Sequence, residues 1–476
     1  MRSKAKAIAF LLLLSFFAKA QQPVILQDST PVTNIGYSLA LYEDKTAALT
    51  IEQVASPANS DRFRASQAAI PNYNLTTSKI WCRFTVINRS ASDNWYLEAG
   101  NPGVGNMEVY MNTLSSATFV MRKGGFSVWA GTRDFFSSSP VFHLDLPKDS
   151  LRTFYVCIYD KLPLQANLNI GNIRQFIKRN HKLDFLNGAF YGLLFMLIIY
   201  NLFIFFSVRD RVFIYYILYV FSNALFISFA NGYGSHLPSG ITNSMVAHPT
   251  WVPFILGTSA CLFTLNFLNV KQNYLFGYRF CVVMMITFTL APLLDIAGLP
   301  VFSIAIVQVL GLVLSVFSVI IGIVVLRKGY RPARFYLLAF GFYLVGLFIY
   351  IASDIQLIPF NAYSHNSLEI GSAFEAVLLS LAVSDKISNF KKDKEQAQES
   401  ALAAAMENER LVREQNILLE RKVKERTIEL QLQKELVEEK NKDILDSIRY
   451  AKRIQQSLLP SESYIKRVLG KLKKER

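Results

Sequence analysis

Apolar residues are concentrated in the middle of the chain, between about Leu183 and Ile387. A membrane-spanning helix needs roughly 20 residues to cross a hydrocarbon core of about 30 Å. Seven stretches meet this requirement: residues 185–207, 212–232, 249–269, 280–299, 301–326, 334–357 and 366–387. Gly298 and Pro300 predict a tight turn between the fourth and fifth stretches, rather than one long helix. Residues 183–387 are therefore predicted to form a seven-helix transmembrane bundle.

Short strand-like runs fill the region before these spans. Clusters of Gly, Pro, Asn and Ser separate them, and they comprise residues 37–42, 80–88, 95–99, 107–111, 141–146 and 154–160. Many short strands with turn residues between them are typical of an antiparallel sandwich. Residues 22–180 are therefore predicted to form an N-terminal all-β sandwich domain, and the fold class is that of a membrane protein with such a domain.

Charged residues crowd the stretch that follows the last span. Residues 389–453 contain no Pro or Gly and are rich in Ala, Glu, Lys, Leu, Gln and Arg, which predicts a long helix. Residues 388–459 are predicted to form an imperfect coiled coil in which Asn416 favours a dimer, and a solvated single helix is the alternative. Residues 460–476 form a basic C-terminal tail. The heptad register places Leu402, Val412, Asn416, Leu419 and Val423 at core positions.

The N-terminus has the three parts of a secretory signal peptide. Basic residues come first, an apolar run extends from Ala7 to Ala18, and a small-residue cleavage site ends at Ala20. The apolar run is shorter than the roughly 20 residues of a membrane span, so an uncleaved anchor is the weaker interpretation. Residues 1–20 are therefore predicted to be a signal peptide, and residues 22–180 are predicted to be exported.

The net charge is +15, and the distribution of Lys and Arg among the loops indicates the orientation of the spans. Lys and Arg occupy alternate loops, whereas the loops 233–248, 295–300 and 358–365 contain neither. The positive-inside rule places the basic loops in the cytoplasm. The sequence thus predicts a multi-pass protein of a bacterial inner membrane, with a periplasmic N-terminal domain and a cytoplasmic C-terminus. Basic residues within 174–182, ahead of the first span, conflict with the rule, but a signal peptide and a long exported domain override them.

Ligand-binding candidates in the exported domain are aromatic and basic. They are Trp81, Arg83, Trp95, Trp129 and Arg133. Aromatic rings beside guanidinium groups form the platforms on which sandwich domains bind sugars, although core packing is the plainer interpretation for any single Trp. Strand alternation places Trp81 and Arg83 on the face opposite Cys82.

Polar residues within the spans are candidates for signal relay. Glu375 lies in mid-span, where a charge costs about 2.5–3.5 kcal/mol even on the lenient insertion scale, and we interpret it as part of an interhelical lock. Asn201 lies in the first span, where a structural hydrogen bond between helices is the alternative. Arg209, Arg211 and Asp385, at the cytoplasmic ends of spans, complete the relay set.

Recognisable catalytic, metal and nucleic-acid motifs are missing from the sequence. The four cysteines have no metal or redox spacing, and no phosphate-binding loop or nucleophile motif follows Ile387. Cys82 and Cys157 lie in the exported domain, either as a disulfide or as two buried thiols. Positive-inside orientation and lipid attraction account for the basic excess. The sequence therefore predicts no enzyme, no cofactor and no nucleic-acid partner, with the lipid bilayer as a partner.

Two runs of sequence resemble a known receptor family. Residues 200–219, YNLFIFFSVRDRVFIYYILY, and the last span, with GSAFEAVLLSLAVSDKI at 371–387, resemble the bacterial seven-helix receptors with diverse intracellular signalling modules, 7TMR-DISM. The exported segments WCRFT, WYL and FYV, which begin at Trp81, Trp95 and Phe154, are similar to the type 2 extracellular domain of that family. The resemblance implies a jelly-roll sensor domain, a carbohydrate-like ligand and a receptor that signals across the membrane.

The tail carries a second resemblance. Residues 444–460, ILDSIRYAKRIQQSLLP, resemble the helix that precedes SpoIIE-type Ser/Thr phosphatase domains. Only sixteen residues follow Pro460, and Glu462 and Glu475 are their only acidic members, so the metal-binding phosphatase domain is expected to be absent. The favoured interpretation is a receptor with a separate cytoplasmic output protein, a phosphatase or a kinase. The alternative is a truncated membrane-bound phosphatase without its catalytic domain.

Overall fold

The protein is described here from a computed structural model, which covers residues 22–112, 118–354, 357–358 and 362–473. The predicted signal peptide lies outside the described residues. By internal contacts the chain divides into two units, Met1–Ile387 and Ser388–Arg476. The first unit contains the β domain and the membrane helices.

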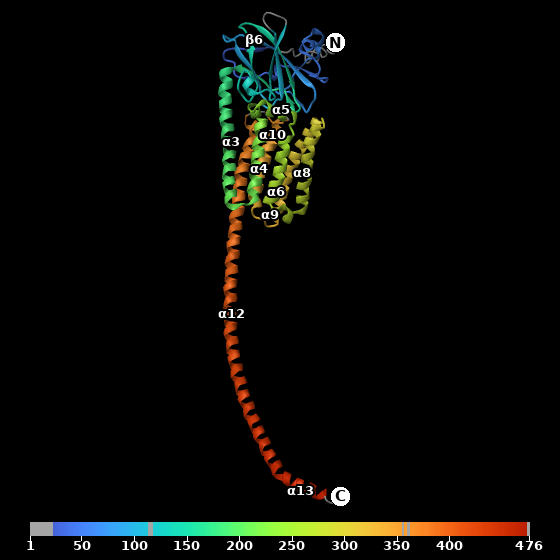
Figure 1. Ribbon diagram of the computed structural model, residues 1–476. Helices are drawn as coiled ribbons and strands as arrows, with labels where there is room; N and C mark the ends of the chain where they lie inside the picture. Colours follow the sequence, from blue (N-terminus) through green and yellow to red (C-terminus); the bar gives the residue numbers. More distant parts are fainter. Residues whose placement is uncertain (1–21, 113–117, 355–356, 359–361, 474–476) are drawn as a thin grey trace, which may run out of the picture. The chain divides into compact units, whose positions relative to one another are not determined.

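The N-terminal domain consists of two main sheets, whose strands are drawn in blue to green in Figure 1. The larger sheet has the order β4-β3-β6-β11-β8-β9, with β1 added to β6, and the smaller has the order β10-β7-β13-β2. The larger sheet comprises β1 (Val24–Leu26), β3 (Ala40–Asp44), β4 (Arg64–Ala65), β6 (Lys79–Asn88), β8 (Asn106–Asn112), β9 (Phe119–Gly124) and β11 (Leu151–Tyr159). The smaller comprises β2 (Thr33–Asn34), β7 (Asn94–Ala99), β10 (Val141–Asp145) and β13 (Leu168–Asn172), and a separate pair is β5 (Asn72–Asn74) with β12 (Leu164–Gln165).

The apolar core of this domain follows from strand alternation. Cys82, Phe84 and Val86 of β6 lie on one face and belong to a buried cluster that also contains Leu97 and Phe154. The rings of Phe84 and Phe154, opposite each other on β6 and β11, are stacked with centroids 5.5 Å apart. The predicted all-β domain is confirmed. One strand starts later than predicted, because residues 36–38 form a 3₁₀ turn and β3 begins only at Ala40.

The opposite face of the larger sheet is also covered. The chain between β3 and β4 forms α2 (Ile51–Val54) and the 3₁₀ segment η2 (Pro57–Arg62), and α2 packs on Trp81 and Tyr155. Cys157, opposite Trp81 in the register, lies in this cluster, whereas Cys82 lies in the core between the sheets. Side chains on opposite faces of a sheet cannot form a disulfide. Cys82 and Cys157 are therefore two separate buried thiols.

Long apolar helices follow the β domain. Those that form the bundle are α3 (Ile173–Val208), α4 (Arg211–Ala230), α6 (Trp251–Phe267), α8 (Leu275–Ile296), α9 (Pro300–Arg327), α10 (Ala333–Asp354) and the start of α12 (Ser367–Leu458). Shorter helical segments are η3 (Ala130–Thr132), η4 (Tyr233–His236), α5 (Ser239–Ala247), α7 (Val270–Asn273) and α11 (Ala362–His365). The predicted turn between α8 and α9 is present, with Gly298 in the left-handed region at φ +83°.

The third predicted span differs from the other six. In the described part of the chain, 6 helices are long and apolar enough to cross a membrane, and a bent pair, Gly240–Ala247 with Trp251–Phe267, raises the number to 7 if it counts as one span. The two halves of the pair meet at 76°. At 17 residues and about 1.5 Å per residue, α6 alone reaches roughly 26 Å, slightly less than the hydrocarbon core.

The second unit is helical. The part of α12 beyond Ile387 continues to Leu458, and α13 (Glu462–Leu472) follows after Pro460. The long C-terminal helix is thus confirmed, and the predicted basic tail contains a helix of its own. The apolar core positions of the heptad register, among them Leu402, Leu419 and Val423, are exposed along this helix.

Candidate functional site

A row of hydrogen bonds joins the last membrane helix to α4. On α12 the side chains involved, at 369, 372 and 375, recur every three residues, and the carbonyl of residue 376 lies four residues after 372, which places the groups on one helical face. On α4 the partners recur in the opposite chain direction, as expected for antiparallel neighbours. The contacts are Asn231 Nδ2 to Glu369 Oε1 at 3.1 Å, Asn223 Nδ2 to Ser372 Oγ at 2.6 Å, Tyr219 hydroxyl to Glu375 Oε1 at 2.7 Å and Tyr216 hydroxyl to the Ala376 carbonyl at 2.8 Å. We call this row the α4–α12 ladder.

Glu375 is the buried acid of the ladder. Its side chain is fully enclosed, and it contacts the Tyr219 hydroxyl through Oε1. The other carboxyl oxygen, Oε2, has no hydrogen-bond partner among the described residues. Tyr219 is itself stacked between Phe263 and Phe340. The predicted mid-span acid therefore bonds to a neighbouring helix, and one half of its carboxyl group is left unsatisfied.

A second helix, α3, also forms a hydrogen bond with α12. Asn201 of α3 is buried and donates from Nδ2 to Ser380 Oγ at 2.9 Å and to the Leu197 carbonyl at 2.8 Å. Hydrogen bonds of this kind within a membrane contribute on average about 0.6 kcal/mol and at most about 1.7 kcal/mol each. Asn201 thus contacts α12 directly, and α12 is bonded to both α3 and α4.

The end of the apolar part of α12 has polar contacts of its own. Asp385 lies 3.8 Å from Arg334 at the start of α10, and Lys386 donates to the carbonyls of Asn266 and Phe267 at 3.1 and 3.0 Å. Lys386 was not among the residues predicted to relay the signal. Its position next to Asp385 at the end of an apolar run resembles an ordinary positive-inside charge, and the sequence alone cannot indicate that its amine reaches the end of α6.

Arg209 and Arg211 have a different role from the ladder residues. Arg209 ends α3 in the left-handed region, at φ +60°, and its N–H bonds to the Phe205 carbonyl at 2.7 Å. Arg211 opens α4, while the Asp210 side chain between them caps that helix by accepting from the Val212 N–H at 2.8 Å. These residues form the tight turn between two membrane helices.

The five ligand-binding candidates do not come together. Trp95 lies in the core between the sheets, where its Nε1 donates to Ser90 Oγ at 3.0 Å, and Trp81 is buried under α2. Arg133 donates to main-chain carbonyls, among them Gly125 at 2.7 Å. Arg83 stacks over the ring of Phe63, whereas Trp129 is exposed at 42%. Trp81 and Trp95 are closed to a ligand in this structure, because each sheet face that carries them is covered.

The β domain continues into the first membrane helix without a linker. Strand β13 ends at Asn172 and α3 begins at Ile173. The Asn172 side chain caps the helix by accepting from the Arg174 N–H at 3.0 Å, and Gln175 completes a capping box. Gln175 also donates to the Thr30 carbonyl at 3.0 Å. A strand of the smaller sheet is thereby joined to α3 through a well-defined helix start.

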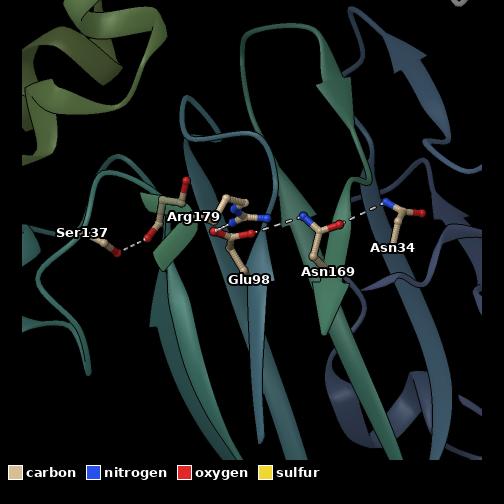
Figure 2. A network of polar contacts seen from close by, with 6 residues as sticks. Asn34, Glu98, Ser137, Asn169 and Arg179 are labelled. Atoms are coloured by element: carbon tan, nitrogen blue, oxygen red, sulfur yellow. Dashed lines mark hydrogen bonds and ion pairs between the residues drawn. The ribbon is translucent and has the colours of Figure 1, made fainter. Parts of the chain in front are cut away.

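A buried acid of the smaller sheet faces this helix start. Glu98 of β7 forms an ion pair with Arg179 of α3 and accepts from Asn169 Nδ2 at 3.2 Å. Asn169 in turn accepts from Asn34 at 3.4 Å. Figure 2 shows the four side chains in a row across the neighbouring strands β7, β13 and β2. We call them the junction network.

Burial dominates the ionisation of Glu98. It raises the pKa of the carboxyl above its ordinary value of 4.5, and the nearby Arg179 charge and the hydrogen bonds from Arg179 and Asn169 offset the rise only in part. The carboxylate side chain is 1% exposed, whereas that of Arg179 is 37% exposed. The pair therefore couples a desolvated acid of the sheet to a partly solvated base of α3.

Loops of the β domain also contact other helical segments of the membrane domain. The ring of Phe126 lies 5.5 Å from that of Phe229 in α4, and Lys161 donates to the Ala247 carbonyl at 2.7 Å. The β domain thus contacts α3, α4 and the segment before α6.

Among the described residues, no group of three or more His, Cys, Asp or Glu side chains has an arrangement suited to a metal ion.

The first unit, Met1–Ile387, matches two known protein families, one over the membrane helices and one over the β domain. Residues 183–386 match the family described as 7TM diverse intracellular signalling. Residues 36–172 match the family described as 7TMR-DISM extracellular 2. The chain belongs to the 7TMR-DISM receptors. It is a multi-pass membrane protein and a transmembrane signalling receptor, with a β domain of the type 2 extracellular class. A search of curated proteins gives no match.

Proposed function

We propose that this 7TMR-DISM receptor senses a ligand in the periplasm of a bacterium and transmits the signal through α3 and α12 to a cytoplasmic coiled coil. The observation that carries the proposal is the double attachment of α3. Its first part is bonded to the sensor sheet through Glu98 and Arg179, and its second half is bonded to α12 through Asn201. A displacement of the sheet would therefore act on α12 through one continuous helix.

The output end of the proposed route is the helix beyond Ile387. Since α12 extends to Leu458, a rotation at Glu375 would turn the heptad positions that follow in the same helix. The exposed apolar residues along this segment support a homodimer in which a second copy covers them. In this proposal the chain is not an enzyme, and it acts on a separate cytoplasmic phosphatase or kinase.

Cysteine crosslinking tests the dimeric coil. Leu419→Cys, at a core position of the register, is expected to crosslink in membranes at least about fivefold more than Arg421→Cys, because core positions of a parallel dimer face each other. The four native cysteines are buried and interfere little. Crosslinking that depends on Leu419→Cys and disappears on dilution into excess lipid would indicate random collision, and equal crosslinking at both positions would contradict the dimer.

Reporter fusions test the orientation. Fusions after residues 240 and 362 are expected to report a periplasmic location, and fusions after residues 210, 275, 330 and 400 a cytoplasmic one, because only the latter loops are basic. The fusion at residue 240 is the most informative, since it lies at the start of the bent α5–α6 pair. A cytoplasmic report at residue 362 would contradict seven spans.

A further inference from the structure

A groove on the β domain is separate from the ladder and from the junction network. It is open to solvent, has a volume of about 910 Å³ and lies where β4 stops pairing with β3. Within the described residues, β4 pairs with β3 only at Ala40 and Leu41, so the following residues of β3 line the groove on one side. The chain from η2 through β4 to β5 lines the other side.

Positive charge predominates in this groove. Lys45, Arg62 and Arg64 line it and are exposed, and Glu43 is the only acidic residue of the lining. One oxygen of the Glu43 carboxyl already accepts from Ser78 Oγ at 2.8 Å. The three cations are therefore largely available to an anion that enters from water.

Neutral groups of the lining complement these charges. Arg62 Nη1 donates to the Tyr42 hydroxyl at 3.2 Å, which orients the guanidinium group. Burial raises the pKa of the half-buried Tyr73 to about 12, so its hydroxyl keeps its proton at neutral pH. Gln67 and Asn74 add amide groups, each with both donors and an acceptor. Such amides suit the hydroxyl groups of a polyol.

We propose that this groove is the ligand site of the receptor and that it binds an acidic oligosaccharide, whose carboxylates pair with Arg62 and Arg64. Guanidinium groups bind carboxylates through two parallel hydrogen bonds, which favours this ligand over a neutral sugar. A phosphate group would present similar charge, and competition with inorganic phosphate distinguishes it from a carboxylate. The inference rests on the proposed receptor function, but the binding test needs no signalling.

Calorimetry on the full chain in lipid nanodiscs tests the groove, with trigalacturonic acid as the probe. Wild type is expected to bind it, and the double variant Arg62→Gln/Arg64→Gln is expected to bind at least about tenfold more weakly. Arg89→Gln, an exposed arginine outside the lining, is the matched control and should bind as wild type does. Raising the salt from about 0.05 to about 0.5 M should weaken wild-type binding.

Two further probes, maltotriose and inorganic phosphate, identify the chemical class of the ligand. The neutral trisaccharide should bind at least about tenfold more weakly than trigalacturonic acid, and phosphate should not displace the acidic sugar at equal concentration. Maltotriose binding as tightly as the acid, or phosphate displacing the acid efficiently, would overturn the proposed ligand class. Equal binding by wild type and the double variant, or no binding to folded wild type, would overturn the site.

The result of the ligand-binding test can be separated from the result of the test for signal transfer to the coil. A thermal melt checks that each variant is folded. If trigalacturonic acid fails to bind while Glu375→Leu still alters the coil, the ligand site is wrong and the receptor function stands. If the acid binds and the coil never responds to any change in the bundle, the groove is right and the relay is wrong.

Discussion

Glu375→Leu is expected to change crosslinking between engineered cysteines in the coil while leaving membrane insertion intact. The substitution removes the bond to Tyr219, one rung of the α4–α12 ladder. A membrane hydrogen bond of about 0.6–1.7 kcal/mol corresponds to a shift of roughly three- to eighteenfold between two helix positions. The measurement compares the rate of disulfide formation at Leu402→Cys with that at Val412→Cys, because a rotation of α12 changes their ratio.

Glu375→Gln is the matched control for this effect. The amide retains an acceptor for the Tyr219 hydroxyl, so Gln is expected to alter the crosslinking ratio less than Leu does. Protease protection of the N-terminal domain verifies insertion for both variants. An unchanged ratio in a correctly inserted Glu375→Leu protein would make Glu375 a packing residue and would remove the ladder from the signal route.

Arg179→Met is expected to destabilise the β domain at neutral pH by about 2–3 kcal/mol. Removing one member of a buried ion pair typically costs about 3–5 kcal/mol, and the partial exposure of Arg179 reduces this value. For a domain of this size the loss corresponds to a drop in Tm of roughly 5–10 °C. Tryptophan fluorescence measures it directly, since Trp81 and Trp95 are buried in this domain. Arg174→Met, at an exposed arginine of the same helix, is the control.

The Glu98 pKa determines how this stability depends on pH. Its folded-state pKa lies above the ordinary value of 4.5, so the folded domain binds the proton more tightly than the unfolded chain. The contribution of Glu98 to stability is therefore complete below about pH 4.5 and is lost as the pH rises through the raised pKa. The stability of wild type relative to Glu98→Gln should decline over this window. A flat difference would indicate that Arg179 fully offsets the burial of Glu98.

The same pair resolves a conflict in the charge pattern. Basic residues before the first span oppose the positive-inside rule, and the sequence offers no specific reason for them. Arg179 is one of these residues, and its partner Glu98 lies 81 positions earlier in the chain. The strand pattern around Glu98 predicts a side chain on the outer face of a sheet, where an acid is normally solvated. Only the start of α3 over that face makes Glu98 buried, and periodicity contains no information on such a contact.

Strand β6, the polar residues of the membrane spans and the groove differ in how far the sequence predicts them. Strand β6 was predicted within one residue, since a ten-residue alternation between two faces leaves little choice of register. Asn201 and Glu375 stand out because polar groups in hydrocarbon need partners, but the partners, Ser380 and Tyr219, look like ordinary helix residues. The groove arises from three segments between β3 and β5, and no local motif marks it.

A double-mutant cycle tests the central claim that the junction network and the ladder belong to one signal route. Arg179→Met and Glu375→Leu are combined, and the crosslinking ratio of Leu402→Cys to Val412→Cys is measured in membranes for wild type, each single variant and the double variant. Distant sites that act independently give additive free energies within about 0.3–0.5 kcal/mol. A coupling of at least about 1 kcal/mol is predicted, because both changes act on the position of α12. Additive effects in correctly inserted proteins would contradict the route from the sensor sheet through α3 to α12.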